Sequence, residues 1–114
     1  MISLVRDQVS ISMLRDLAEA GFGDLVKGVV DVRLELIAIG GELHADEEAL
    51  LLDEGSNQVD LWGINLYPME FETSGWLEFD SMINVRPRQG NRTRSVEDPA
   101  IRERIVEIVG RLVR

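Results

Sequence analysis

Leu25-Val26-Lys27-Gly28-Val29-Val30-Asp31-Val32-Arg33-Leu34-Glu35-Leu36-Ile37-Ala38-Ile39 is a run rich in β-branched and apolar residues, and it predicts the centre of a sheet. From Val30 to Leu36, apolar and charged residues alternate with the two-residue period of a half-buried strand. Fifteen residues exceed the usual length of one strand. We therefore expect a break near Arg33 to Glu35 and a hairpin, although neither glycine nor asparagine marks its turn.

Helices are predicted on both sides of this hairpin, because Ser or Asp stands before segments with helical apolar spacing. Glycine after the first two segments favours the end of a helix there. The third segment has Pro at its first position and the clearest apolar face. The predicted helices are 11–20 after Ser10, 47–54 after Asp46, and a C-terminal helix opened by Asp98 and Pro99, with Ile101, Ile105, Ile108, Val109 and Leu112 buried.

Further strands are predicted at 2–5, 59–67 and 76–85, from short apolar runs and alternating patterns. The element order is then β-α-β-β-α-β-β-α. Paired strands with short links favour an antiparallel or mixed sheet. The sequence therefore predicts a single α+β domain over residues 1–114, with the helices packed mainly on one face of the sheet.

Composition limits the possible functions. The chain has 114 residues, 45% of them hydrophobic, a formal net charge of −9 and no cysteine. Without cysteine there is neither a disulfide nor a thiolate metal site. An acidic chain does not fit non-specific nucleic-acid binding, where a basic domain is expected. Since no apolar run reaches the length of a signal peptide or membrane span, we expect a cytoplasmic protein without membrane contact.

The charge is uneven, and residues 84–95 reverse its sign. This loop carries four arginines and no acid, whereas Leu34 to Val85 holds twelve acids and neither lysine nor arginine. Guanidinium groups match phosphate and carboxylate oxygens, and Gly90 lets backbone amides approach a ligand. The acids Glu97 and Asp98 place such a ligand nearer Gly90 to Arg94. The residues predicted to bind an anion are Arg86, Arg88, Asn91, Arg92 and Arg94.

The same arginines could instead be bound by carboxylates of protein origin. They could pair with acids of their own chain, or with the acidic surface of a second subunit in a homo-oligomer. The loop matches neither the P-loop nor the dinucleotide-binding glycine pattern, so its sequence does not name the anion.

A secondary polar cluster surrounds the only histidine, His44. Its members are Glu42, His44 and Asp46. One imidazole with carboxylates could hold a metal or act as a general base. A lone histidine offers few ligands, however, so we assign neither a metal, a cofactor nor a catalytic residue. If Arg86 and Arg92 reached this cluster, the Arg-rich loop and the polar cluster around His44 would form one electrostatic clasp.

Three segments carry a resemblance to a known family: 40–46 (Gly-Gly-Glu-Leu-His-Ala-Asp), 61–68 (Leu-Trp-Gly-Ile-Asn-Leu-Tyr-Pro) and 80–94. Together they resemble a family of small, uncharacterised bacterial proteins, known as a domain of unknown function. The resemblance covers most of the chain. It implies a bacterial, cytoplasmic, single-domain protein and carries over no activity.

The sequence thus favours a binding module whose Arg-rich loop takes an anionic group, such as a phosphate, a nucleotide or a carboxylate-rich partner. The alternatives are a homo-oligomeric interaction protein and a metal-assisted hydrolase at His44.

Overall fold

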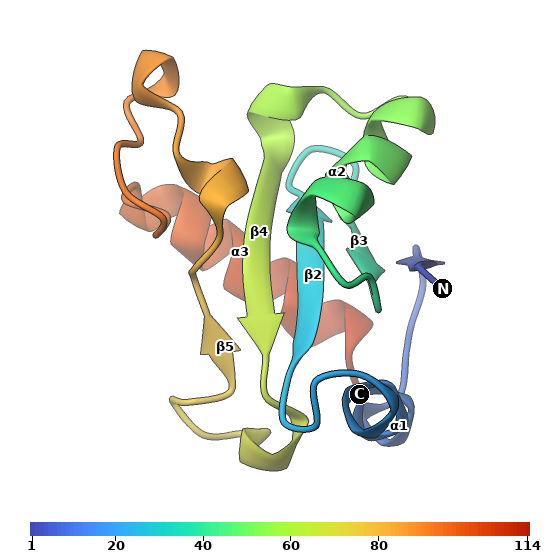
Figure 1. The fold of residues 1–114 in the computed structure, drawn as a ribbon. Coiled ribbons are helices and arrows are strands. Elements are labelled where there is room, and N and C mark those ends of the chain that lie inside the picture. Colours follow the sequence, from blue (N-terminus) through green and yellow to red (C-terminus); the bar gives the residue numbers. More distant parts are fainter.

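A computed structural model describes residues 1–114 and shows one five-stranded sheet in the order β1-β3-β2-β4-β5 (Figure 1). Every strand pair is antiparallel. The α+β class and the predicted element order are confirmed. The strands are β1 (Ser3–Val5), β2 (Val26–Asp31), β3 (Leu36–Ile39), β4 (Leu61–Leu66) and β5 (Leu77–Glu78).

The predicted hairpin is present between β2 and β3, with Asp31 paired to Leu36 across it. Its turn is made by the Asp31 side chain, whose Oδ1 accepts the backbone N–H groups of Arg33 and Leu34, each at 2.8 Å. Glu35 then takes a positive φ of 59°. An aspartate that bonds to the backbone two residues later is a turn signal, so it replaces the glycine or asparagine that is missing here.

The helices cover both faces of the sheet. In Figure 1, α3 (Pro99–Leu112) lies behind the sheet and α2 (His44–Asp53) lies in front of it. Helix α1 (Ile11–Ala20) contributes Leu14 and Ala18 to the core on the side of α3. The main core lies between the sheet and α1 with α3, and a smaller cluster that includes Leu51 lies under α2. The helices therefore gather mainly on one face, as expected, and α2 is the exception.

Helix capping follows the sequence at two of the three helices. Ser10 Oγ accepts the N–H of Met13 at 3.0 Å, and Asp98 Oδ1 accepts the N–H of Ala100 at 2.9 Å. The prediction that Asp46 caps the middle helix is wrong, because α2 already begins at His44 and no side chain caps it.

The early start of α2 follows from Glu47, which turns inward. Its Oε2 accepts the N–H of Gly41 at 2.9 Å, and Glu47 is completely buried. This bond brings the segment before Asp46 close to the first turn, so residues 44–46 join the helix.

The long strand predicted over 76–85 is also wrong, because only Leu77–Glu78 pairs as a strand and a 3₁₀ turn follows at Met82–Asn84. The Asn84 side chain takes over the pairing with β4. Its Oδ1 accepts the N–H of Gly63 at 2.8 Å, and its Nδ2 donates to the Gly63 carbonyl at 3.0 Å. A buried side-chain amide thus satisfies the edge of β4 that a strand would otherwise satisfy.

None of the helices combines the length and the apolar character needed to cross a lipid bilayer.

Candidate functional site

The Arg-rich loop closes on itself and projects from the body of the protein (Figure 1). Arg86 and Asn91 exchange two backbone hydrogen bonds, of 2.7 and 3.1 Å, at its base. Between them, a 3₁₀ turn at Pro87–Gln89 ends at Gly90, whose φ is 81°. The loop is therefore a hydrogen-bonded turn, in which Gly90 supplies a left-handed conformation.

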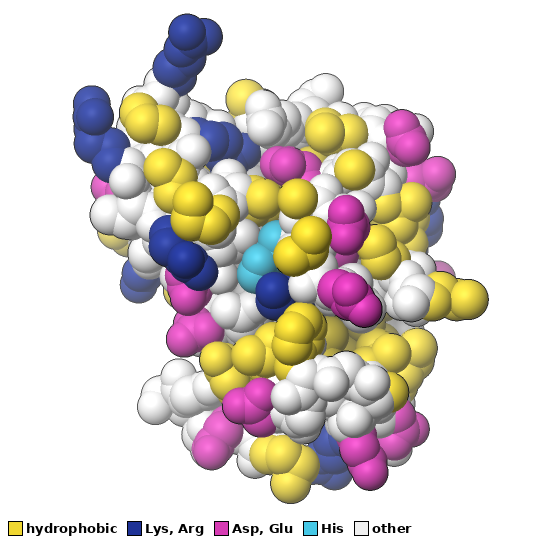
Figure 2. Space-filling model, in the orientation of Figure 1, with side chains coloured by type: hydrophobic (Ala, Val, Ile, Leu, Met, Phe, Trp, Pro, Cys, Tyr) yellow, Lys and Arg dark blue, Asp and Glu magenta, His cyan; other side chains and the backbone are white.

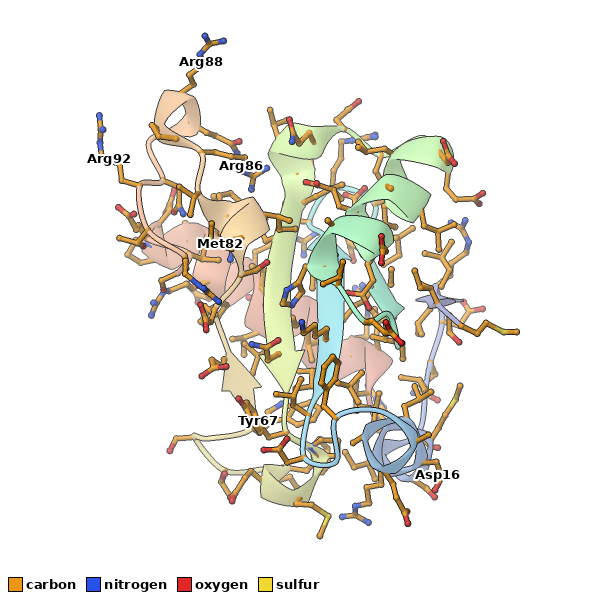
Figure 3. The ribbon with its side chains drawn as sticks, in the orientation of Figure 1. Asp16, Tyr67, Met82, Arg86, Arg88 and Arg92 are labelled. Carbon is orange, nitrogen blue, oxygen red and sulfur yellow. The ribbon has the colours of Figure 1, made fainter.

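Arg86 points inward toward β4 (Figure 3). Its guanidinium donates to the carbonyl of Leu61 at 2.6 Å and to that of Gln58, and it lies 4.1 Å from the centre of the Trp62 ring. Burial lowers the pKa of this guanidinium from its ordinary value. Arg86 thus fastens the loop to β4 through Nη1 and Nη2, while its Nε is buried without a hydrogen-bond partner.

Asn91 is only 3% exposed, and its amide is fully bonded inside the loop. Nδ2 donates to the carbonyls of Asn84 and Ser95, both at 2.7 Å, and Oδ1 accepts the N–H of Glu97 at 2.9 Å. The Asn91 side chain therefore supports the loop and has no free donor to offer the anion that we expected it to bind.

The backbone amides of the loop are occupied as well. Glu97 Oε2 accepts the N–H groups of Arg92 and Thr93, at 2.7 and 2.8 Å. These backbone hydrogen bonds lower the pKa of the Glu97 carboxyl. A carboxylate of the same chain therefore takes the position that an external anion would need.

The remaining three arginines divide into two kinds. Arg94 Nε lies 2.7 Å from Asp80 Oδ1, in an ion pair whose side chains are both partly exposed. Arg88 and Arg92 form no ion pair and point away from the body (Figure 3). Only these two remain available to an acidic second subunit, so the homo-oligomer hypothesis stays a prediction, which sedimentation at low and high salt would check.

His44 does not form the cluster expected with Glu42 and Asp46, whose side chains are exposed. Its Nε2 lies 2.8 Å from the Ile64 carbonyl and donates to it. Burial is the largest influence and lowers the pKa of His44, although the Ile64 carbonyl opposes it. No three His, Asp or Glu side chains are placed to share a metal ion, so the hydrolase alternative has no ligand set.

His44 and Arg94 nevertheless meet in one hollow, with a volume of about 250 Å³, between the start of α2 and the segment after β5. We call it the Lys27–Arg94 cleft, and define it by Lys27, His44, Asn65, Asp80 and Arg94. Figure 2 shows the only histidine, in cyan, within this face and next to a basic side chain. The electrostatic clasp expected from Arg86 and Arg92 does not form, because Arg86 bonds to the carbonyls beside β4 and Arg92 points away from the body (Figure 3).

Three residues of the cleft, Lys27, Asn65 and Asp80, were not predicted as site residues. Lys27 is half-buried on β2 and makes neither an ion pair nor a hydrogen bond to the protein through its ammonium group. Asn65 on β4 is 7% exposed, and its Oδ1 has no hydrogen-bond partner. The sequence does mark Lys27 and Asn65 in one way, since each is a polar residue within an otherwise apolar strand.

Comparison with known proteins gives the family but not an activity. Neither a curated protein nor a solved structure matches the chain. The family described as "Protein of unknown function (DUF5674)" matches residues 3–112, and the chain therefore belongs to it, as the resemblance predicted.

Proposed function

We propose that the protein is a binding module for a small anionic group, a phosphate or a carboxylate, held in the Lys27–Arg94 cleft. The observation that carries this proposal is the ammonium group of Lys27, which lines the hollow and forms neither an ion pair nor a hydrogen bond with the protein. This ammonium group has no anionic partner in the protein, so a bound oxyanion would give it charge-assisted hydrogen bonds that it otherwise lacks.

The other walls of the cleft add positive potential. His44 and Ala45, at the start of α2, line it, and no side chain caps this helix. The first N–H groups of a helix have no partner within the helix and favour negative charge.

Two of the acids at the cleft, Asp80 and Glu47, carry little free negative charge. Asp80 is the one acid that lines it, and Arg94 pairs with it. Glu47, in the first turn of α2, has its pKa raised to about 9 by burial and is therefore protonated at pH 7. Asp46, in the same turn, and Glu78, which accepts from Asn65 Nδ2 at 2.9 Å, are further acids beside the cleft, so Lys27 is the one cation of the cleft without a carboxylate partner.

Inorganic phosphate is expected to raise the melting temperature of the wild-type protein. At ten times its dissociation constant, a ligand stabilises by about 1.4 kcal/mol, which is about 5 °C in a domain of this size. Lys27→Met removes a charged donor and should weaken binding about tenfold, so the shift at the same concentration falls to about 1 to 2 °C. Thermal melting with and without phosphate measures this.

Arg88→Met is the matched control, because it removes the same charge from an exposed arginine outside the cleft. It should keep the full shift. If Arg88→Met loses the shift and Lys27→Met keeps it, the anion binds the loop and the proposal is wrong. A wild-type protein that phosphate, sulfate and acetate all fail to stabilise would equally reject it.

A further inference from the structure

A second hollow adjoins the Lys27–Arg94 cleft. It has a volume of about 440 Å³ and lies between the end of α1, the start of β2 and the Gly40–Leu43 segment. Leu25, Lys27 and Leu43 line both hollows, so the two spaces share one wall. We call the second one the Phe22 hollow.

The two hollows differ in chemistry. The Phe22 hollow is lined mainly by apolar side chains, among them Leu17, Phe22 and Val26. Phe22 and Leu43 are 49% and 55% exposed, which leaves much apolar surface in water at this place. The cleft beside it is polar and presents Lys27, His44 and Asn65.

Lys27 joins the two environments. Its ammonium group lies 4.8 Å from the centre of the Phe22 ring, which places a cation at the edge of the apolar surface. The long apolar stem of a lysine can cover apolar surface while its charged end stays outside it. An anion bound to this ammonium group would therefore sit with the apolar surface of Phe22 within reach.

We infer that one small molecule occupies both hollows, and that it combines an oxyanion with an aryl or alkyl group. The oxyanion binds Lys27 and the start of α2, and the apolar part lies against Phe22, Leu17 and Leu43. This inference rests on the proposed function and adds the class of ligand. Pockets for small molecules are typically apolar with a few converging polar groups, and the two hollows together have this character.

The test compares inorganic phosphate with phenyl phosphate by isothermal titration calorimetry on the full chain. Partial burial of the phenyl ring should make phenyl phosphate bind about tenfold more tightly than phosphate. Phe22→Ala should remove most of this tenfold difference, measured as the ratio of the two affinities, because the Phe22 ring also contacts the Lys27 ammonium group that holds both probes. Phe22 is half exposed and outside the helices and strands, so the variant is expected to fold.

Met69→Ala is the control, because Met69 is 76% exposed and lies outside both hollows. It should leave both affinities as in the wild type. Equal binding of the two probes overturns this inference and leaves the proposed function standing, as does a Phe22→Ala variant that weakens both probes equally. Binding of neither probe to the wild type overturns the proposed function and the inference together.

Discussion

Glu47→Gln is expected to gain stability relative to the wild type by about 4 kcal/mol between pH 5 and pH 8. Glu47 is completely buried, and burial raises its pKa from 4.5 to about 9 even though the Gly41 N–H opposes the change. The folded protein therefore keeps this proton in a range where the unfolded chain has released it.

The sign of this pH dependence follows from the pKa of Glu47 in the unfolded chain, 4.5, and in the folded protein, about 9. Below pH 4.5 Glu47 is protonated in both states, and its contribution to folding is complete. As the pH rises toward about 9 the unfolded state ionises first, so the wild type loses about 1.4 kcal/mol per pH unit. Glutamine cannot ionise, and it keeps a carbonyl oxygen for the N–H of Gly41.

Urea unfolding of both proteins at pH 5, 6.5 and 8 measures the difference. Glu103→Gln, at an exposed position on α3, should show little change with pH relative to the wild type. A constant difference between Glu47→Gln and the wild type over this range would show that Glu47 is ionised in the folded protein. The first turn of α2 would then carry a buried negative charge, and the potential proposed for the cleft would be lost.

Gly63→Ala is expected to lower the free energy of unfolding by about 3 kcal/mol. A Cβ atom at Gly63 would lie 2.5 Å from Ser81 Cβ and 2.6 Å from Ser81 Oγ. Both segments are fixed, since Gly63 pairs with Val29 on one side and with the Asn84 side chain on the other. The clash therefore cannot be relieved without breaking hydrogen bonds.

The double variant Gly63→Ala with Ser81→Gly identifies the cause. Removing the Ser81 side chain takes away the two closest contacts, so the two substitutions together should cost at least about 1 kcal/mol less than the sum of their separate costs. Gly110→Ala is the control: a Cβ there meets nothing within 4 Å, and alanine favours the helix. Strictly additive effects in chemical denaturation would mean that segment 81–84 does not rest on β4 as described.

The sequence predicts the elements of this fold better than it predicts their edges. Hydrophobic period and capping residues locate α1, α3 and the β2–β3 hairpin, because these depend on neighbouring residues. The alternating pattern overestimates the short β5, since the bond between Asn84 and Gly63 joins residues that are far apart in the chain. The buried position of Glu47 is likewise hidden from the sequence, because a glutamate in the first turn of a helix usually faces water.

The candidate site was also hard to predict, because it depends on contacts between residues that are far apart in the chain. Four arginines in one loop indicate an anion site, but whether a guanidinium group is free depends on contacts from elsewhere. Arg86 is used by the carbonyls of Gln58 and Leu61, and Arg94 by Asp80. Lys27 stands in a strand and gives no comparable signal, and only the folded chain shows that its ammonium group meets the Phe22 ring but no carboxylate.

The most direct test of the proposed cleft is a titration of ¹⁵N-labelled protein with inorganic phosphate, followed through the backbone amide resonances. Binding in the Lys27–Arg94 cleft predicts saturable shifts of the amides of His44 and Ala45 at the start of α2, with smaller changes at Lys27 and Asn65. Shifts confined to Gly90, Arg92 and Thr93 in the Arg-rich loop, or an unchanged spectrum at high phosphate, would contradict it.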